Sequence, residues 1–251
     1  MTLYSYILIV VFAFLFETID GSIGMGYGTI LTPVLLLMGL DPLQVVPAVL
    51  VSQLSGDFLA TLFHHRFKNV DLSFGSKHFK IAVLLSTLSL AGSVIGVAVM
   101  ISLPSFLVSL YIGALFALTG LIVLITIKKN YKFSRFRLFC LGSLAAFNKG
   151  ISGGGYGPIV TTGQILAGIK VRPAIAIISL SEGITCAVAV LMYVIIGKNI
   201  DWLLSIALSI GVVSSTPLTA LIVRKVESQK LRLLIGTCTL VLGLSTIAGS
   251  L

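Results

Sequence analysis

The chain has 251 residues, of which 57% are apolar and only 10% charged, and its mean hydropathy is +1.12. Soluble domains carry about 25% charged residues, so this composition excludes an ordinary soluble domain. The net charge of +9 does not indicate nucleic-acid binding, because the basic residues cluster in short loops between apolar runs, as the positive-inside rule requires.

Four long runs carry no Asp, Glu, Lys, Arg or His: 81–103, 105–127, 202–223 and 233–251. Each is long enough to cross about 30 Å of hydrocarbon as a helix. Strands of a membrane barrel would alternate polar and apolar residues, and these runs do not. The sequence therefore predicts an all-α polytopic membrane protein. The first apolar run, 3–19, follows no basic segment, so we expect it to belong to the fold and not to a cleaved signal.

The first half of the chain is organised around a glycine-rich segment, Asp20–Gly28, which interrupts the apolar sequence. Gly costs about 1 kcal/mol relative to Ala in a helix interior, so we expect the helix to break there. The predicted elements of this half, in chain order, are the run 3–19, the break at 20–28, a short helix over 29–40, a turn at Asp41-Pro42, a span over 43–63, a basic loop at 64–80, and spans over 81–103 and 105–127.

After a basic loop at 128–137, the second half repeats this plan. Its glycine-rich segment, Lys149–Gly157, lies 129 residues after the first, and ten of 34 aligned positions between 20–53 and 149–182 are identical. Its elements are the run 138–148, the break at 149–157, a short helix over 158–169, a turn at 170–173, a span over 174–196, a span over 202–223, a basic loop at 224–232 and a span over 233–251. This pattern indicates an internal duplication with repeats at 1–130 and 131–251, each a broken segment followed by three spans.

The charge distribution predicts the orientation of the repeats. If each glycine-centred segment enters and returns on its own side, as a re-entrant hairpin or as two short spans, loops 64–80, 128–137, 168–173 and 224–232 share one face. They hold 15 of the 17 Lys and Arg residues, so the positive-inside rule places them in the cytoplasm and both termini on the opposite side. The halves are then inverted relative to each other, which is a transporter architecture.

The two breaks are the predicted binding site. Broken backbone is tolerated in hydrocarbon only where protein buries it or water lines it, and the amide groups at a helix start favour an anion. Lys149 adds a positive charge. The alternative is that the glycines only permit close helix packing. The residues expected to contact the anion are Gly24, Gly26, Tyr27, Gly28, Thr32, Asn148, Lys149, Ser152, Gly153, Gly154, Gly155, Tyr156, Gly157 and Thr161.

Four acids lie within apolar segments: Glu17, Asp20, Asp57 and Glu182. A carboxylate inside the bilayer is costly and is functional by default, so these are candidates for proton coupling. Glu17 and Asp20 are expected nearer the water than the other two. The alternative is a structural ion pair, such as Lys149 with Glu182 or with Asp20.

Other sites are weaker. Gly150-Ile151-Ser152-Gly153 matches a short pattern of intramembrane serine proteases, but His64, His65 and His78 share one basic loop, away from any span that could present a base to Ser152. We therefore expect no enzyme, no catalytic residue, no metal site and no cofactor.

Cys140, Cys186 and Cys238 lie in apolar segments and are expected to be packing residues.

The motif from Asp20-Gly21 to Gly28-Thr29-Ile30-Leu31-Thr32-Pro33, the Gly39-Leu40-Asp41-Pro42 turn and the second glycine-rich copy resemble the sulfite exporter TauE/SafE family. The resemblance covers essentially the whole chain. It implies a membrane transporter, with sulfite or an organosulfonate as the substrate class.

The sequence thus predicts a secondary transporter in the cell membrane that exports a small sulfur oxyanion through a midplane site, with proton coupling as a weaker hypothesis. The alternatives are an uncoupled anion channel and a cation or metal permease that uses the acids. The partners implied are the small anionic substrate and the lipid bilayer, with no nucleic acid and with a homo-oligomer left open.

Overall fold

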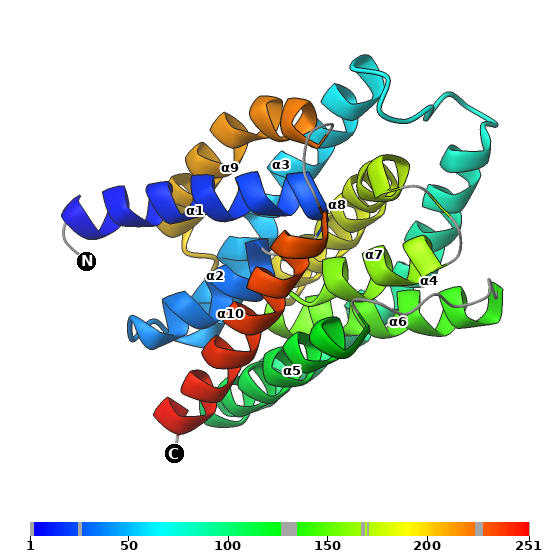
Figure 1. Ribbon diagram of the computed structural model, residues 1–251. Coiled ribbons are helices and arrows are strands. Elements are labelled where there is room, and N and C mark those ends of the chain that lie inside the picture. The colour runs from blue at the N-terminus through cyan, green and yellow to red at the C-terminus, as the bar shows by residue number, and fades with distance from the viewer. Residues whose placement is uncertain are drawn as a thin grey trace.

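The computed structural model describes residues 3–24, 27–126, 135–166, 169, 171–223 and 228–250 (Figure 1). Within these residues all regular structure is helical, and none of them lies in a strand. In chain order the helices are α1 (Leu3–Ile23), α2 (Tyr27–Leu37), α3 (Pro42–Arg66), α4 (Lys77–Ser102), α5 (Ser105–Thr126), α6 (Arg135–Ser152), α7 (Tyr156–Leu166), α8 (Val171–Ile196), α9 (Trp202–Ile222) and α10 (Ser228–Ser250).

Six helices in the described part of the chain are long and apolar enough to cross a membrane: α1, α3, α4, α5, α8 and α9. Large apolar side chains on their outer faces, such as Leu62, Ile195 and Leu203, are exposed. In a bilayer these faces would contact lipid, where their exposure carries no penalty. The prediction of an all-α, multi-pass membrane protein is confirmed.

Several helices extend beyond the predicted apolar runs into charged sequence. Helix α4 begins at Lys77 and not at residue 81, because the Ser76 side chain caps it by accepting a hydrogen bond from the backbone N–H of Phe79 at 3.1 Å. Helix α6 begins at Arg135, within the predicted loop 128–137, and covers 18 residues. Charged residues end the apolar run, but they do not end a helix that projects past the hydrocarbon.

The glycine breaks are shorter than predicted. Helix α1 continues to Ile23 and α6 continues to Ser152, so that the second interruption is limited to Gly153–Gly155. Gly24, Gly153 and Gly155 have φ angles of +75°, +68° and +78°. These left-handed conformations favour glycine, which has no Cβ atom to clash with the backbone.

Other glycines of the two motifs lie inside helices and serve packing. A Cβ atom at Gly150 would lie 2.7 Å from the Ser93 carbonyl oxygen on α4, and one at Gly21 would lie 2.6 Å from Thr219 Oγ1 on α9. The prediction that the helix breaks at these positions is wrong. Close approach of a neighbouring helix stabilises the helical form there and outweighs the poor helix propensity of glycine.

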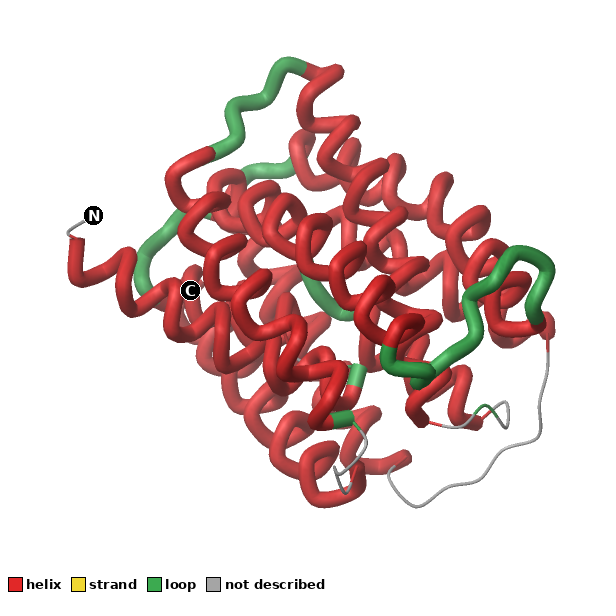
Figure 2. The backbone as a smooth tube through the Cα atoms, turned by 90° about the horizontal axis from the view of Figure 1, so that it is seen from above, coloured by secondary structure: helices red, strands yellow, loops and turns green. Residues whose placement is uncertain are grey.

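Each broken segment returns toward the end of the bundle from which it came. Helix α1 runs beside α9 in the same direction, with Ala13 against Gly211 in the middle of α9 and Gly21 against Thr219 near its end. Helix α2 then runs back, and both termini lie on the same side of the molecule in Figures 1 and 2. In the second segment, Val160 of α7 belongs to the same apolar cluster as Val70. Val70 lies in the loop after α3, at the end of the bundle opposite to the start of α3.

The two halves of the chain pack through exchanged partners. Helix α1 packs against α9 and α6 packs against α4, so each broken helix lies on a helix of the other half. Helix α3 packs against α8 in the interior, and α5 lies along α10 (Figure 1). The apolar core around Leu50, Phe116 and Ile151 likewise draws residues from both halves. The interior where the breaks meet is therefore built jointly.

Candidate functional site

The two glycine breaks meet directly in the interior. A Cβ atom at Gly28 would overlap the carbonyl oxygen of Gly153, and one at Gly154 would lie 2.5 Å from the carbonyl oxygen of Gly28. The backbones of α2 and of the α6–α7 break thus touch with no side chain between them. Only glycine permits this approach, and two motifs 129 residues apart in sequence become one structural feature.

Threonines of the short helices face the opposite break. Thr161 Oγ1 donates a hydrogen bond to the Gly24 carbonyl oxygen, and the Gly155 N–H donates to Thr29 Oγ1 at 3.3 Å. Thr32 Oγ1 would lie 3.4 Å from a Cβ atom at Gly153, and this buried hydroxyl has no hydrogen-bond partner. An unpaired buried hydroxyl is costly, so Thr32 offers a donor to any ligand at the crossing.

A buried ion pair lies beside the crossing. The Lys149 ammonium is completely buried and lies 2.7 Å from Glu182 Oε1. It also donates a hydrogen bond to Gln53 Oε1, and Gln53 Nε2 donates to Glu182 Oε1 at 3.3 Å. Of the alternatives drawn from the sequence, the pairing of Lys149 with Glu182 is the one found in the structure.

This triad joins equivalent positions of the repeat. Gln53 and Glu182 are 129 residues apart, the offset of the duplication, and they lie on α3 and α8, which pack against each other. Lys149 is the equivalent of Asp20 by the same offset. The first half thus carries the neutral amide of Gln53 where the second half carries the carboxylate of Glu182. It carries the carboxylate of Asp20 where the second half carries Lys149.

The other acids surround the triad. Asp57 is buried against Gly183, and its Oδ2 has no hydrogen-bond partner. Glu17 is also buried, with Oε1 3.8 Å from a Cβ position at Gly56. Asp20 is half-buried near the end of α1, within electrostatic range of Glu182 and Lys149.

The two predicted tyrosines are buried and hydrogen-bonded. Tyr27 and Tyr156 are completely buried, and their hydroxyls hydrogen-bond to Ser52 at 2.7 Å and to Ser89 at 3.2 Å. Both rings are enclosed by apolar core clusters. The two hydroxyls thus join the first residues of α2 and α7 to α3 and α4.

The remaining predicted residues shape the second break. The Ser152 hydroxyl donates to the Asn148 carbonyl oxygen at 2.7 Å and accepts from the Gly154 N–H at 3.1 Å. The Asn148 side chain accepts a hydrogen bond from the Tyr111 hydroxyl. Gly157 is buried in the first turn of α7, and Gly26 lies outside the described residues. The Ser152 hydroxyl is therefore engaged in the turn that ends α6.

The hydrogen bonds of the Ser152 hydroxyl, within the described residues, go to its own turn and not to a histidine. His64 is buried at the end of α3, where its Nδ1 pairs with the Asn69 side chain at 3.1 Å. Across the described part of the chain, no group of three or more His, Cys, Asp or Glu residues is placed to hold a metal ion.

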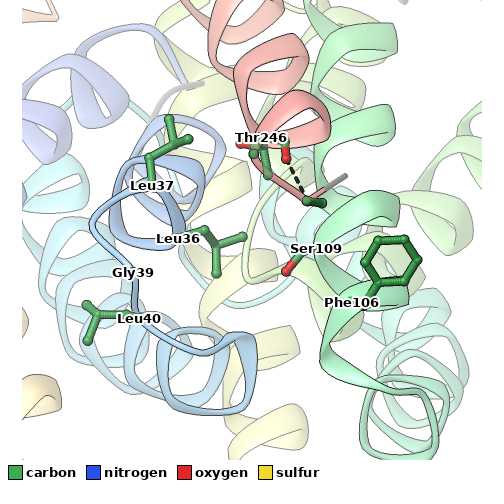
Figure 3. A pocket seen from close by; sticks show the side chains of 9 residues that line it. Leu36, Leu37, Gly39, Leu40, Phe106, Ser109 and Thr246 are labelled. Atoms are coloured by element: carbon green, nitrogen blue, oxygen red, sulfur yellow. Dashed lines mark hydrogen bonds between the residues drawn. The ribbon is translucent and has the colours of Figure 1, made fainter.

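A separate hollow opens at the end of the bundle that holds the termini (Figure 3). It has a volume of about 390 Å³ and lies between the end of α2, the start of α5 and the end of α10. Its walls include Leu36, Leu40, Phe106, Ser109 and Thr246. None of the residues predicted to contact the anion lines it.

A family model described as "Sulfite exporter TauE/SafE" matches residues 9–246 of the chain. The chain belongs to the sulfite exporter TauE/SafE family. It is also similar to the "Probable membrane transporter protein YtnM" of Bacillus subtilis (strain 168), with 29% identity over 244 residues that cover 91% of this chain and 79% of that protein. No solved structure matches the chain.

The family assignment confirms the resemblance seen in the sequence and makes this TauE/SafE chain a multi-pass membrane protein of a transporter family. The sequence did not predict the roles of Thr29, Tyr111 and Ser89, because their hydrogen bonds join different helices and produce no periodic pattern along the chain. The sequence matched Gln53 with Glu182 by the repeat offset and offered Gln53 as a polar group that could line the site or join helices, but it did not place both residues in one triad with Lys149.

Proposed function

We propose that this TauE/SafE chain is a secondary transporter that exports a small anion, sulfite or an organosulfonate, through a site where the two glycine breaks meet. In this proposal residues 1–130 and 131–251 are inverted repeats. The exchanged packing of α1 on α9 and of α6 on α4, and the return of each broken segment to a different end, support this relation. Paired broken helices near the midplane are the site architecture of many such transporters.

The observation that carries the proposal is the fully buried Lys149 beside the crossing. A buried ammonium is costly unless it is paired, so its retention inside a membrane protein indicates a function. The glycines keep side chains away from the crossing, and Thr32 adds an unpaired hydroxyl. A small oxyanion would find there a positive charge and a hydroxyl donor.

The direction and the substrate class rest on the family description, which names sulfite export. Proton coupling would use the buried carboxyls of Glu182, Asp57 and Glu17, with Asp20 near the end of α1. An uncoupled anion channel and a cation permease that uses these acids are the competing functions. The unpartnered oxygen of Asp57 is the observation that favours the cation permease.

Transport into proteoliposomes tests the proposal. Purified protein is expected to carry sulfite and a short alkylsulfonate faster than protein-free vesicles, and an imposed pH gradient is expected to change the rate. Flux of sulfonate that is indifferent to the gradient would favour a channel. Flux of monovalent or divalent cations without anion flux would favour the permease.

The role of Lys149 is tested by Lys149→Gln, which removes the charge and keeps a hydrogen-bonding group beside Glu182. Loss of a charged hydrogen bond to the anion is expected to cost about 1.5–3 kcal/mol of binding free energy, a roughly 10- to 100-fold weaker apparent affinity. The matched control is Lys198→Gln in the exposed loop after α8, which is expected to leave the affinity unchanged. Equal affinities in all three proteins would remove Lys149 from the site.

A further inference from the structure

The buried triad poses a problem for any anion that binds Lys149. The ammonium carries three N–H donors, and two of them already point to Gln53 Oε1 and Glu182 Oε1. Glu182 is 4% exposed, and Lys149 is the cation that pairs with it. An anion that approaches Lys149 therefore meets a carboxylate that already neutralises it.

The surroundings make coexistence of the two negative charges unfavourable. Asp57 from α3 and Glu17 and Asp20 from α1 all lie within electrostatic range of the pair, and the Cys186 thiol is the titratable group one turn further along α8. A bound anion would add a second negative charge beside the Glu182 carboxylate in a region of low dielectric constant.

We propose that Glu182 is a built-in competitor of the transported anion. The anion takes the place of the Glu182 carboxylate at Lys149, and the displaced carboxyl takes up one proton, so that one anion and one proton enter the site together. When the anion leaves, Glu182 releases the proton and pairs with Lys149 again. This inference rests on the proposed function, because it needs an anion at Lys149.

Gln53 is the member of the triad whose side chain does not gain or lose a proton. Its amide oxygen accepts from Lys149 and its amide nitrogen donates to Glu182 at 3.3 Å, so it holds the ammonium in place whether or not Glu182 is ionised. It is also the repeat equivalent of Glu182. Glu182→Gln therefore places at residue 182 the side chain that the first half already uses at the matching position. This substitution removes the ionisable carboxyl at residue 182 and keeps a side chain of similar size with an oxygen that can accept from Lys149.

The test measures binding of a short alkylsulfonate, which stays singly charged throughout the range, to the full-length protein in detergent between pH 5 and pH 8. For the wild type we expect the affinity to fall as the pH rises, by up to about tenfold per pH unit, because each bound anion brings one proton with it. Binding in weakly buffered solution is expected to take up about one proton per anion. Glu182→Gln is expected to bind with an affinity independent of pH and to take up no proton.

The matched control is Asp71→Asn, which removes an exposed carboxylate from the loop after α3 and is expected to keep the wild-type pH dependence and proton uptake. Tight wild-type binding without proton uptake would overturn the inference and leave the proposed anion site standing, and this measurement needs no variant. Proton uptake that persists in Glu182→Gln would also overturn it. Sulfonate binding by neither protein would overturn the proposed anion site and the inference together.

Discussion

At the scale of single residues, the contact between Gly28 and Gly154 is the most sensitive point of the site. We expect Gly154→Ala to lower stability by about 1–3 kcal/mol, the usual cost of overpacking a core. Its Cβ atom would lie 2.5 Å from a backbone oxygen, and the backbone cannot rotate away as a side chain can. A thermal unfolding curve in detergent measures the change, and anion flux is expected to fall with it.

The control for this substitution is Gly142→Ala on α6. There a Cβ atom would meet only the side-chain end of Leu85 at 3.3 Å and of Leu88 at 3.9 Å. Those ends can move, and alanine has the better helix propensity, so the unfolding temperature is expected to stay level or to rise. A Gly154→Ala protein as stable and as active as Gly142→Ala would show that the two breaks do not touch as described.

At the scale of elements, α5 and α10 pack through matching glycines. Gly113 and Gly120 on α5 face Gly243 and Gly236 on α10, so both helices present glycines seven residues apart. A Cβ atom at Gly113 would lie 2.9 Å from the Gly243 carbonyl oxygen, and one at Gly120 would lie 2.7 Å from that of Gly236. Small residues at such positions let membrane helices approach closely.

We therefore expect Gly120→Leu to push α5 away from α10 and to lower the unfolding temperature of the purified protein by several degrees, because about 1–3 kcal/mol of overpacking strain is a large part of the stability of a domain. Gly249→Ala on α10 is the control, since its Cβ atom would reach only Leu37 Cδ2 at 3.7 Å. Comparable melting of the two variants would contradict the close α5–α10 contact.

How far the sequence predicts these elements depends on what kind of signal they leave. Uncharged runs located the spans, and the 129-residue offset matched Gln53 with Glu182 and Asp20 with Lys149, because composition and repetition are visible along the chain. The extent of the breaks was not visible. Gly21 and Gly150 stay helical only because Thr219 and Ser93 lie against them, and such partners are known only once the helices are packed. The same limit hid the matching glycines of α5 and α10.

At the scale of the whole molecule, the return of each broken segment to its own end fixes where the termini lie. Both termini lie on one side of the bundle in Figures 1 and 2. Helix α3, 25 residues long, carries the chain from the hollow beside Leu40 to the basic loop after Arg66 at the other end. Since basic loops stay in the cytoplasm, the termini are predicted to face the opposite side of the membrane.

Reporter fusions in intact bacteria test this arrangement. Alkaline phosphatase folds only outside the cytoplasm, so its fusion to the C-terminus is expected to be active and the matching green fluorescent protein fusion to be dark. The control places the same reporters after Phe74, an exposed residue of the loop between α3 and α4, where the opposite result is expected. A fluorescent C-terminal fusion would mean an odd number of crossings in one glycine-broken segment. The halves would then no longer be inverted, and the two helix starts could not face each other across the middle of the membrane.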